Sequence, residues 1–192
     1  FINSTEENIT LRELRHPLLV WQQQHEEGHE VIPVDLVINP YIRVVTITGP
    51  NTGGKTVTLK TLGFATLMAK IGLFVPAREP VELPWFDQIL ADIGDEQSLE
   101  QSLSTFSGHI RRISRILNAI SPTDDREAQG EEEGQENNDE INSPSPPPSL
   151  VLLDEVGAGT DPVEGSALAI ALLRYLAEHS MLTIATTHFG EL

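Results

Sequence analysis

Residues 49–56 are the part of this sequence whose residue types and spacing most directly suggest chemistry. They read Gly-Pro-Asn-Thr-Gly-Gly-Lys-Thr and satisfy the pattern G-x-x-x-x-G-K-[ST]. Glycines let the backbone N–H groups approach phosphate oxygens, and the helix start that follows favours anions. In this pattern the lysine reaches the β and γ phosphates and the hydroxyl can coordinate Mg²⁺. The sequence therefore predicts a nucleotide-binding loop with contacts from Gly49, Pro50, Asn51, Thr52, Gly53, Gly54, Lys55, Thr56 and Val57.

A second candidate site follows the apolar run of residues 150–153. This run, Leu-Val-Leu-Leu, is typical of a buried strand, and Asp154 and Glu155 come directly after it. Ligands bind at the carboxyl ends of strands in open α/β sheets. We expect Asp154 to hold Mg²⁺ through its water shell and Glu155 to act as general base toward an attacking water. The alternative interpretation is an acidic turn after a strand.

Two further segments carry side chains suited to a nucleotide-binding site. His188 ends the strand-like run of residues 183–186 and could hydrogen-bond the γ-phosphate or the attacking water; the alternative is a surface or capping histidine. Ser104 and Thr105 lie in a run of hydroxyls at a predicted helix start. Hydroxyls there can simply cap the helix, or the helix terminus can face an anion.

The elements that must position these residues alternate between strands and helices. Apolar residues between Phe106 and Ile120 recur at spacings of three and four, which predicts one buried helix face. Alternating strands and helices favour a parallel sheet covered on both faces. The predicted strands are residues 31–38, 42–48, 88–92, 150–153 and 181–186, and the predicted helices are 55–71, 105–120 and 162–179.

Residues 121–149 have a different composition from the rest of the chain. They contain nine acidic residues against one arginine, several prolines and almost no apolar side chains, and they carry about half of the net charge of −17. Such a segment cannot bury enough surface to offset its ordering entropy. We predict a disordered surface insert; an acidic docking segment is the alternative. The overall negative charge argues against a broad basic surface for nucleic acid.

Composition also limits the cellular locations that fit the protein. The sequence has no cysteine, so disulfides and thiolate metal sites are excluded. No apolar run is long enough to span a bilayer, so no membrane contact is expected. Residues 1–10 lack a basic start and an apolar signal core. These features favour a cytoplasmic location.

Four ordered motifs together resemble the ATPase core of the MutS family. They are ITGPNTGGKTVTLKTLG (residues 47–63), DIGDEQSLEQSLSTFSGHI (92–110), LVLLDEVGAGTDPVEGSALA (150–169) and ATTHFGEL (185–192). The chain is most similar to the second bacterial and plastid branch, MutS type two, which suppresses recombination. The resemblance covers nearly the whole chain outside the insert.

The resemblance implies an α/β fold of the P-loop NTPase class: an ABC-type ATPase with a mostly parallel sheet flanked by helices. It implies ATP and Mg²⁺ as ligands and a homodimer in which Ser104 and Thr105 of one chain cap the γ-phosphate of the other. It places Asn51 near the γ-phosphate, Val31 or Ile32 against the adenine, and residues 157–161 at the dimer contact. Residues 1–17 would end a preceding core domain, and residues 18–192 would form an ATPase domain cut short at its carboxyl end. A plastid location would follow for a plant protein.

The same resemblance leaves several functions open. The motor would couple ATP to a clamp on branched or mismatched DNA that is formed by other domains, and a nuclease would reside in a further domain outside this chain. One alternative is an ATPase of the chromosome-maintenance kind, although its glycine-rich signature is replaced here by Ser-Thr-Phe. Others are a nucleotide-gated dimerisation module and an ATPase that acts on stalled ribosomes.

Overall fold

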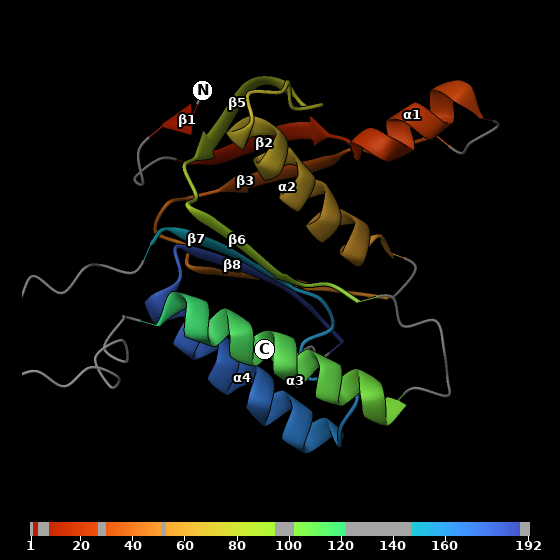
Figure 1. Ribbon diagram of the computed structural model, residues 1–192. Coiled ribbons are helices and arrows are strands. Elements are labelled where there is room, and N and C mark those ends of the chain that lie inside the picture. Colours follow the sequence, from red (N-terminus) through yellow and green to blue (C-terminus); the bar gives the residue numbers. More distant parts are fainter. Residues whose placement is uncertain are drawn as a thin grey trace, which may run out of the picture.

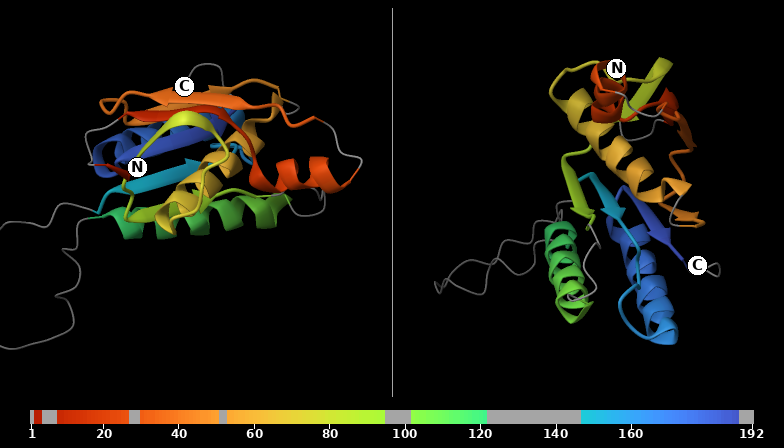
Figure 2. Two further views of the ribbon diagram at one scale, coloured as in Figure 1. Left: turned by 90° about the horizontal axis from the view of Figure 1, so that it is seen from above. Right: turned by 90° about the vertical axis from the view of Figure 1, so that its right-hand side faces the viewer.

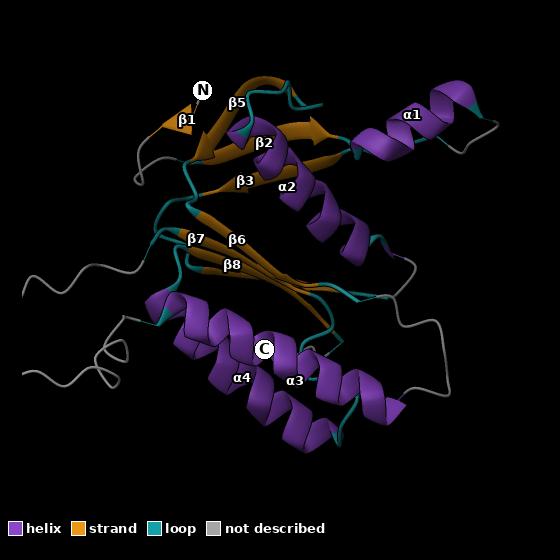
Figure 3. Cartoon of the chain, in the orientation of Figure 1, coloured by secondary structure: helices purple, strands orange, loops and turns teal. Residues whose placement is uncertain are grey.

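The computed structural model describes most of the chain, in six segments. These are residues 2–3, 8–26, 30–50, 53–94, 102–121 and 147–188, with the backbone alone for residues 2–3 and 102–106. They form two four-stranded sheets and four helices, shown in Figures 1 and 3. The insert predicted at residues 121–149 lies mostly outside the described residues.

One sheet is parallel throughout and contains the strands predicted to flank the candidate site. Its strands are β4 (Val44–Thr48), β6 (Gln88–Asp92), β7 (Ser149–Leu153) and β8 (Leu182–Thr187), in the order β4-β8-β7-β6. Each neighbouring pair runs parallel. The α/β class with a parallel sheet flanked by helices is therefore confirmed. The strand bounds differ from the predicted ones by at most two residues.

The second sheet departs from the prediction of a single parallel sheet. It contains β1 (Ile2–Asn3), β2 (Ile9–Leu14), β3 (Val34–Ile38) and β5 (Arg78–Pro84), in the order β1-β5-β2-β3. β2 pairs antiparallel with both β3 and β5. The strand predicted at residues 31–38 is thus shorter and belongs to this sheet, and the strands β1, β2 and β5 were not predicted. The domain boundary after residue 17 stays a prediction. β2 precedes that boundary, and it pairs with β3 and β5, which follow it.

The helices lie on both faces of the parallel sheet. α2 (Lys55–Lys70) lies between the two sheets, while α3 (Ser102–Ile120) and α4 (Pro162–His179) cover the opposite face, as Figures 1 and 2 show. The helix expected from residue 105 begins at Ser102, and α1 (Pro17–His25) was not predicted. No helix in the described segments is long and apolar enough to cross a membrane.

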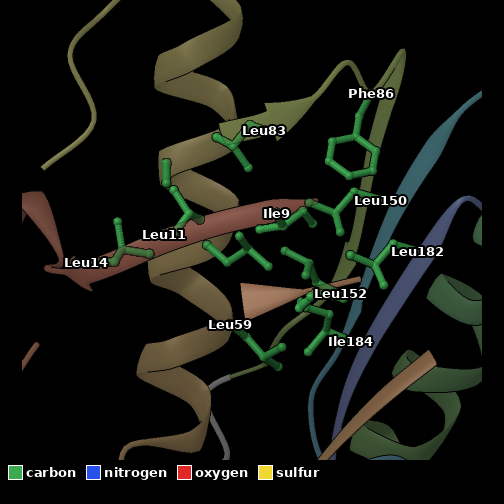
Figure 4. Close-up of a cluster of buried hydrophobic side chains, with 13 residues drawn as sticks. Ile9, Leu11, Leu14, Leu59, Leu83, Phe86, Leu150, Leu152, Leu182 and Ile184 are labelled. Atoms are coloured by element: carbon green, nitrogen blue, oxygen red, sulfur yellow. The ribbon is translucent and has the colours of Figure 1, made fainter. Parts of the chain in front are cut away.

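The alternation of side chains along β7 explains why the parallel sheet has a core on each face. Leu150 and Leu152 join the cluster formed with α2 and β2, shown in Figure 4. Val151 and Leu153 join the second cluster, formed with α3 and α4. Since both faces of β7 are covered, the strand is apolar at every position from 150 to 153. This burial fixes where the next residue, Asp154, emerges.

Ser121 and residues 147–149, at the two ends of the predicted insert, belong to the described fold. Ser121 Oγ lies 3.1 Å from the Tyr175 hydroxyl. Pro148 accepts a hydrogen bond from the Asp87 N–H at 2.8 Å, and Ser149 is buried at the start of β7. Any change to the insert must therefore leave these residues in place.

Candidate nucleotide-binding site

The candidate residues gather at the carboxyl edge of the parallel sheet. The glycine-rich loop follows β4, Asp154 and Glu155 follow β7, and His188 follows β8. In the sheet order, β8 lies between β4 and β7. The end of β8 is therefore placed between the loop and the two carboxylates, at the edge where open α/β sheets bind ligands.

The glycine-rich loop closes onto the start of α2. Gly54 caps the helix with φ +77°, a left-handed conformation that favours glycine. The Gly53 N–H donates to the Pro50 carbonyl at 3.0 Å. Lys55 is buried, 5% exposed, and its ammonium donates to the Gly49 carbonyl across the loop. The lysine head group thus lies within the span of the loop.

Val57, the last predicted nucleotide contact, is half-exposed in the first turn of α2. Asn51 and Thr52, at the tip of the loop, lie outside the described residues, so their roles stay predictions.

Asp154 connects the loop helix to the end of β8. Its Oδ2 accepts a hydrogen bond from Thr56 Oγ1 at 2.7 Å, and its Oδ1 accepts one from Thr186 Oγ1 at 2.5 Å. The carboxylate is buried, 6% exposed. The contact between Thr56 and Asp154 was expected from their predicted roles, whereas Thr186 was not singled out from the sequence. Its position two residues before His188 is the signal that could have identified it.

The donor set around Asp154 fits Mg²⁺. Thr56 Oγ1 and Asp154 Oδ2 are two hard oxygen atoms side by side. The described residues contain no group of three or more His, Cys, Asp or Glu side chains that could hold a metal by themselves. Mg²⁺ is usually bound through one or two protein oxygens, with phosphates and waters completing the shell. The residues present match that mode.

Two contacts at the end of β8 hold Glu155, and a third holds the residue after it. The N–H of Glu155 donates to Thr186 Oγ1 at 2.8 Å, and its Oε1 lies 3.0 Å from His188 Nε2. The next residue, Val156, donates its N–H to the Thr186 carbonyl at 2.9 Å. Glu155 has φ +51°, which is unusual for a residue other than glycine. Strained backbone of this kind persists where the surroundings fix it, often at functional sites.

The loop after Glu155 is packed tightly against the start of α4. A Cβ added to Gly165 would lie 2.2 Å from the Gly157 carbonyl oxygen, so only glycine fits. Asp161 caps α4 by accepting hydrogen bonds from the N–H groups of Val163 and Glu164. Residues 157–161, expected at a dimer contact, are therefore fixed to α4 and not loosely attached.

A buried ionic cluster adjoins the same edge. Asp92, the last residue of β6, is 2% exposed, and its carboxylate contacts His109 Nδ1 at 2.7 Å and Arg112 Nε, both on α3. This cluster was not predicted from the sequence. Asp92 and His109 are separated by the segment that joins β6 to α3, so no local spacing links them.

A hollow borders the glycine-rich loop, and its lining does not include Asp154. It is lined by parts of α1, the segment before β3, and the start of α2. Val31 and Ile32, the predicted adenine contacts, line it together with Gly53, Gly54 and Val57. The structure thus places these two residues next to the loop predicted to bind the phosphates.

His16 also lines this hollow. It is buried, and its Nδ1 has no hydrogen-bond partner among the described residues. Burial, and secondarily the Lys60 ammonium, lowers the pKa of His16. Its ring packs edge-on against Phe64, with 5.1 Å between the ring centroids. Burial therefore favours the neutral form of the imidazole.

Among the predicted site residues, the structure brings Lys55, Thr56, Asp154, Glu155 and His188 to one edge of the parallel sheet. Ser104 and Thr105 lie in the first turn of α3, where the backbone alone is described. Their proposed contact with a partner's nucleotide stays a prediction.

Comparison with known proteins shows which family this fold and site belong to. A family model described as MutS domain V matches residues 45–124 and 133–192. An Endonuclease MutS2 of Synechocystis sp. is 65% identical over 189 residues, which cover 97% of this chain and 22% of that protein. Endonuclease MutS2 of Shouchella clausii is 50% identical over 96% of this chain and 19% of that protein. That of Alkaliphilus metalliredigens is 46% identical over 98% and 20%.

The fold and these matches define the chain as domain V of a MutS protein, an ATPase domain. Within that class, the chain belongs to the MutS2 family. The resemblance stated from the sequence motifs is therefore confirmed. The chain spans about a fifth of the length of the curated relatives it matches.

Proposed function

We propose that this domain binds ATP with Mg²⁺ and hydrolyses it, as a P-loop ATPase of the ABC type. The observation that carries the proposal is the pairing of Thr56 with Asp154 and of Glu155 with His188 at one sheet edge, beside the loop that holds Lys55. Phosphoryl transfer to water needs positioned charge and a positioned base more than covalent chemistry. These five side chains supply both.

Each residue has one role in the proposed reaction. Lys55 and the loop N–H groups bind the β and γ phosphates, and Thr56 and Asp154 hold Mg²⁺, which when bound neutralises phosphate charge. Glu155 accepts the proton of the water that attacks the γ-phosphorus in line with the departing ADP. His188 orients the Glu155 carboxylate through their 3.0 Å contact. Thr186 fixes the backbone of Glu155 and the carboxylate of Asp154 together.

The base of the nucleotide is proposed to lie in the hollow beside the loop. Its apolar lining includes Val31 and Ile32, and it opens onto Gly53 and Gly54. An adenine in that position would continue directly from phosphates on the loop. Apolar concave sites with a few polar groups are the usual form of such pockets.

At the level of the whole protein, we propose a homodimer with two shared ATP sites. Ser104 and Thr105 of one chain would face the γ-phosphate bound by the other chain. The nucleotide state would then control a clamp, built by other domains, on branched or mismatched DNA, and so suppress recombination. The curated relatives are named as endonucleases, and a nuclease would belong to a further domain. A stalled ribosome is the alternative effector.

The substitution Glu155→Gln tests hydrolysis. In the full-length protein, this variant should bind ATP as wild type does and lose about 10²–10⁴-fold in turnover, the usual contribution of a positioned general base. It should also accumulate as an ATP-bound dimer. Turnover close to that of wild type would exclude Glu155 as the base.

Mixed dimers test the shared site. A Lys55→Ala chain combined with a Ser104→Ala/Thr105→Ala chain leaves one site with an intact loop and intact partner hydroxyls. Such dimers, purified through two different affinity tags, should be more active than either parent. Activity no higher than that of the parents would point to a self-contained site.

A further inference from the structure

The buried carboxylate of Asp92 has no role in the chemistry proposed above, although it lies beside that site. Its side chain is 3% exposed, and it contacts both His109 and Arg112 of α3. A buried carboxylate is costly unless it is paired and hydrogen-bonded. Here one carboxylate receives two donors from a single helix, one turn apart. The arrangement is therefore a specific attachment of α3 to the end of β6.

This attachment lies near the end of α3 that carries Ser104 and Thr105. The apolar contacts of α3 lie further along the helix, where Ile116 and Ile120 are buried. His109 follows Thr105 by four residues, which is about one helical turn. Asp92 thus fixes the amino-terminal part of α3, while the apolar residues fix its carboxyl-terminal part.

The same attachment is tied to the strand-end carboxylates. The Asp92 carbonyl accepts a hydrogen bond from the Asp154 N–H at 2.9 Å. Asp92 and His109 also line a small cavity together with Asp154, Glu155 and Gly157. The distance between α3 and the nucleotide-binding edge of its own chain is therefore set through Asp92.

We propose that Asp92 is a positioning residue for the ATP site of the partner chain. By holding His109 and Arg112, it sets the place of the first turn of α3, and so of the Ser104–Thr105 element that faces the partner's γ-phosphate. This inference rests on the shared-site function proposed above. Asp92 acts through α3 and contacts neither nucleotide, so its loss should impair the partner's site and leave ATP binding by its own loop intact.

The test uses full-length dimers with two affinity tags. The Asp92→Asn homodimer should keep the ATP affinity of wild type and lose about 10²-fold in turnover, the scale expected when a reacting group is displaced by about 1 Å. The matched control is Asp87→Asn, an exposed aspartate directly before the opposite end of β6. It should keep both ATP affinity and turnover. Asp92→Asn activity equal to that of wild type would overturn the proposal.

Mixed dimers then assign Asp92 to one side of the shared site. Paired with a Lys55→Ala chain, the Asp92→Asn chain contributes an intact loop, and its partner contributes an intact α3, so activity should recover. Paired with a Ser104→Ala/Thr105→Ala chain, both chains carry a faulty α3, and activity should stay low. The proposal requires recovery in the first pairing and none in the second. Any other pattern, which is recovery in the second pairing alone, in both pairings or in neither, would overturn it. Such a pattern would show an effect on the chain's own site or on folding in general.

The remaining outcomes are also decisive. If Lys55→Ala with Ser104→Ala/Thr105→Ala gives no active dimer, the shared site itself fails and the role of Asp92 fails with it. If that reference pair is active, failure of the Asp92 pattern is separate from the proposed function. Should Asp92→Asn not fold, Arg112→Gln removes the half-exposed donor of the cluster instead and must give the same pairing pattern.

Discussion

His188 and Glu155 face each other across the ends of two adjacent parallel strands, with 3.0 Å between the imidazole Nε2 and the carboxylate Oε1. The sequence places them 33 positions apart, yet the strand order brings them to one point. The Glu155 side chain is 20% exposed and that of His188 is 40% exposed. The carboxylate is therefore oriented by a group that itself remains open to solvent or substrate.

Replacement of His188 should weaken catalysis without removing it. In His188→Ala the carboxylate of Glu155 remains but loses the contact that orients it. We expect ATP affinity to be retained and turnover to fall by less than the roughly 10²–10⁴-fold expected for loss of the general base. Steady-state hydrolysis of His188→Ala and Glu155→Gln, measured side by side, checks this order. Equal losses in the two variants would give His188 a direct catalytic role.

Thr186 should be as important for the positions of Asp154 and Glu155 as the residues identified from the motifs are for the site. Its hydroxyl donates to Asp154 and accepts from the Glu155 N–H, and it is fully buried. Thr186→Val keeps the volume but leaves that N–H unsatisfied, which should cost about 1–3 kcal/mol in the free energy of unfolding. Turnover should fall as well.

Thr186→Ser, which keeps the hydroxyl, is the control for Thr186→Val. Urea unfolding and hydrolysis assays should show the serine variant close to wild type in both respects. If the valine and serine variants behave alike, the hydroxyl is not what positions the two carboxylates.

The parts of the fold that the sequence predicted share a simple physical signal. β7 is apolar throughout because both of its faces are covered, and α4 begins with a capping aspartate and ends before Ser180. Both signals are local in the sequence, so β7 and α4 can be predicted without knowing which distant residues they contact. The fold class and the strands of the parallel sheet could therefore be read from local pattern.

The elements that were missed lack such a signal. β5 reads Arg-Glu-Pro-Val-Glu-Leu-Pro, and its prolines and charges are unfavourable in an isolated strand. α1 buries none of its residues, and its apolar residues 18–21 are consecutive, without the spacing of three and four that marks a helix face. The partners of Asp92 and Thr186 depend on strand order and helix placement, which local spacing does not determine.

Lys55 should control affinity for ATP. Its ammonium is buried at the loop, and removal of one partner from a desolvated charge contact costs about 3–5 kcal/mol. Because each 1.4 kcal/mol corresponds to about tenfold in affinity, Lys55→Ala should bind ATP at least about a hundredfold more weakly. Calorimetric titration measures this directly. Lys60→Ala, a charge-matched change on the same helix, should bind as wild type does; equal affinity of the Lys55 variant would contradict the phosphate-loop assignment.

The acidic insert should be dispensable for folding. Its composition predicts no packed contacts, and halving the length of a flexible loop changes the closure free energy by only about 0.6 kcal/mol. Replacement of residues 123–146 by a Gly-Ser linker of about half that length leaves Ser121 and Pro148 in their observed contacts. The melting temperature should stay within about 2–4 °C. A larger decrease would show that the acidic segment docks on the fold.

His16 should make the stability of the domain depend on pH in one direction. Burial, and then Lys60, lowers its pKa in the folded state below the ordinary value of 6.5. The unfolded chain therefore binds a proton at His16 more readily than the folded chain, and stability falls as the pH drops through 6.5 toward the folded-state pKa. The neutral ring contributes fully above 6.5, where it packs on Phe64.

The comparison with His16→Gln isolates that contribution. At pH 7.5 the variant should be less stable than wild type because it loses the ring contact. At pH 5.5 the difference should shrink, since wild type then bears the cost of keeping His16 neutral and glutamine does not. Urea unfolding at both pH values gives the difference, in which the other titrating groups largely cancel. A difference that stays constant or grows on acidification would show that His16 is not held neutral by the fold.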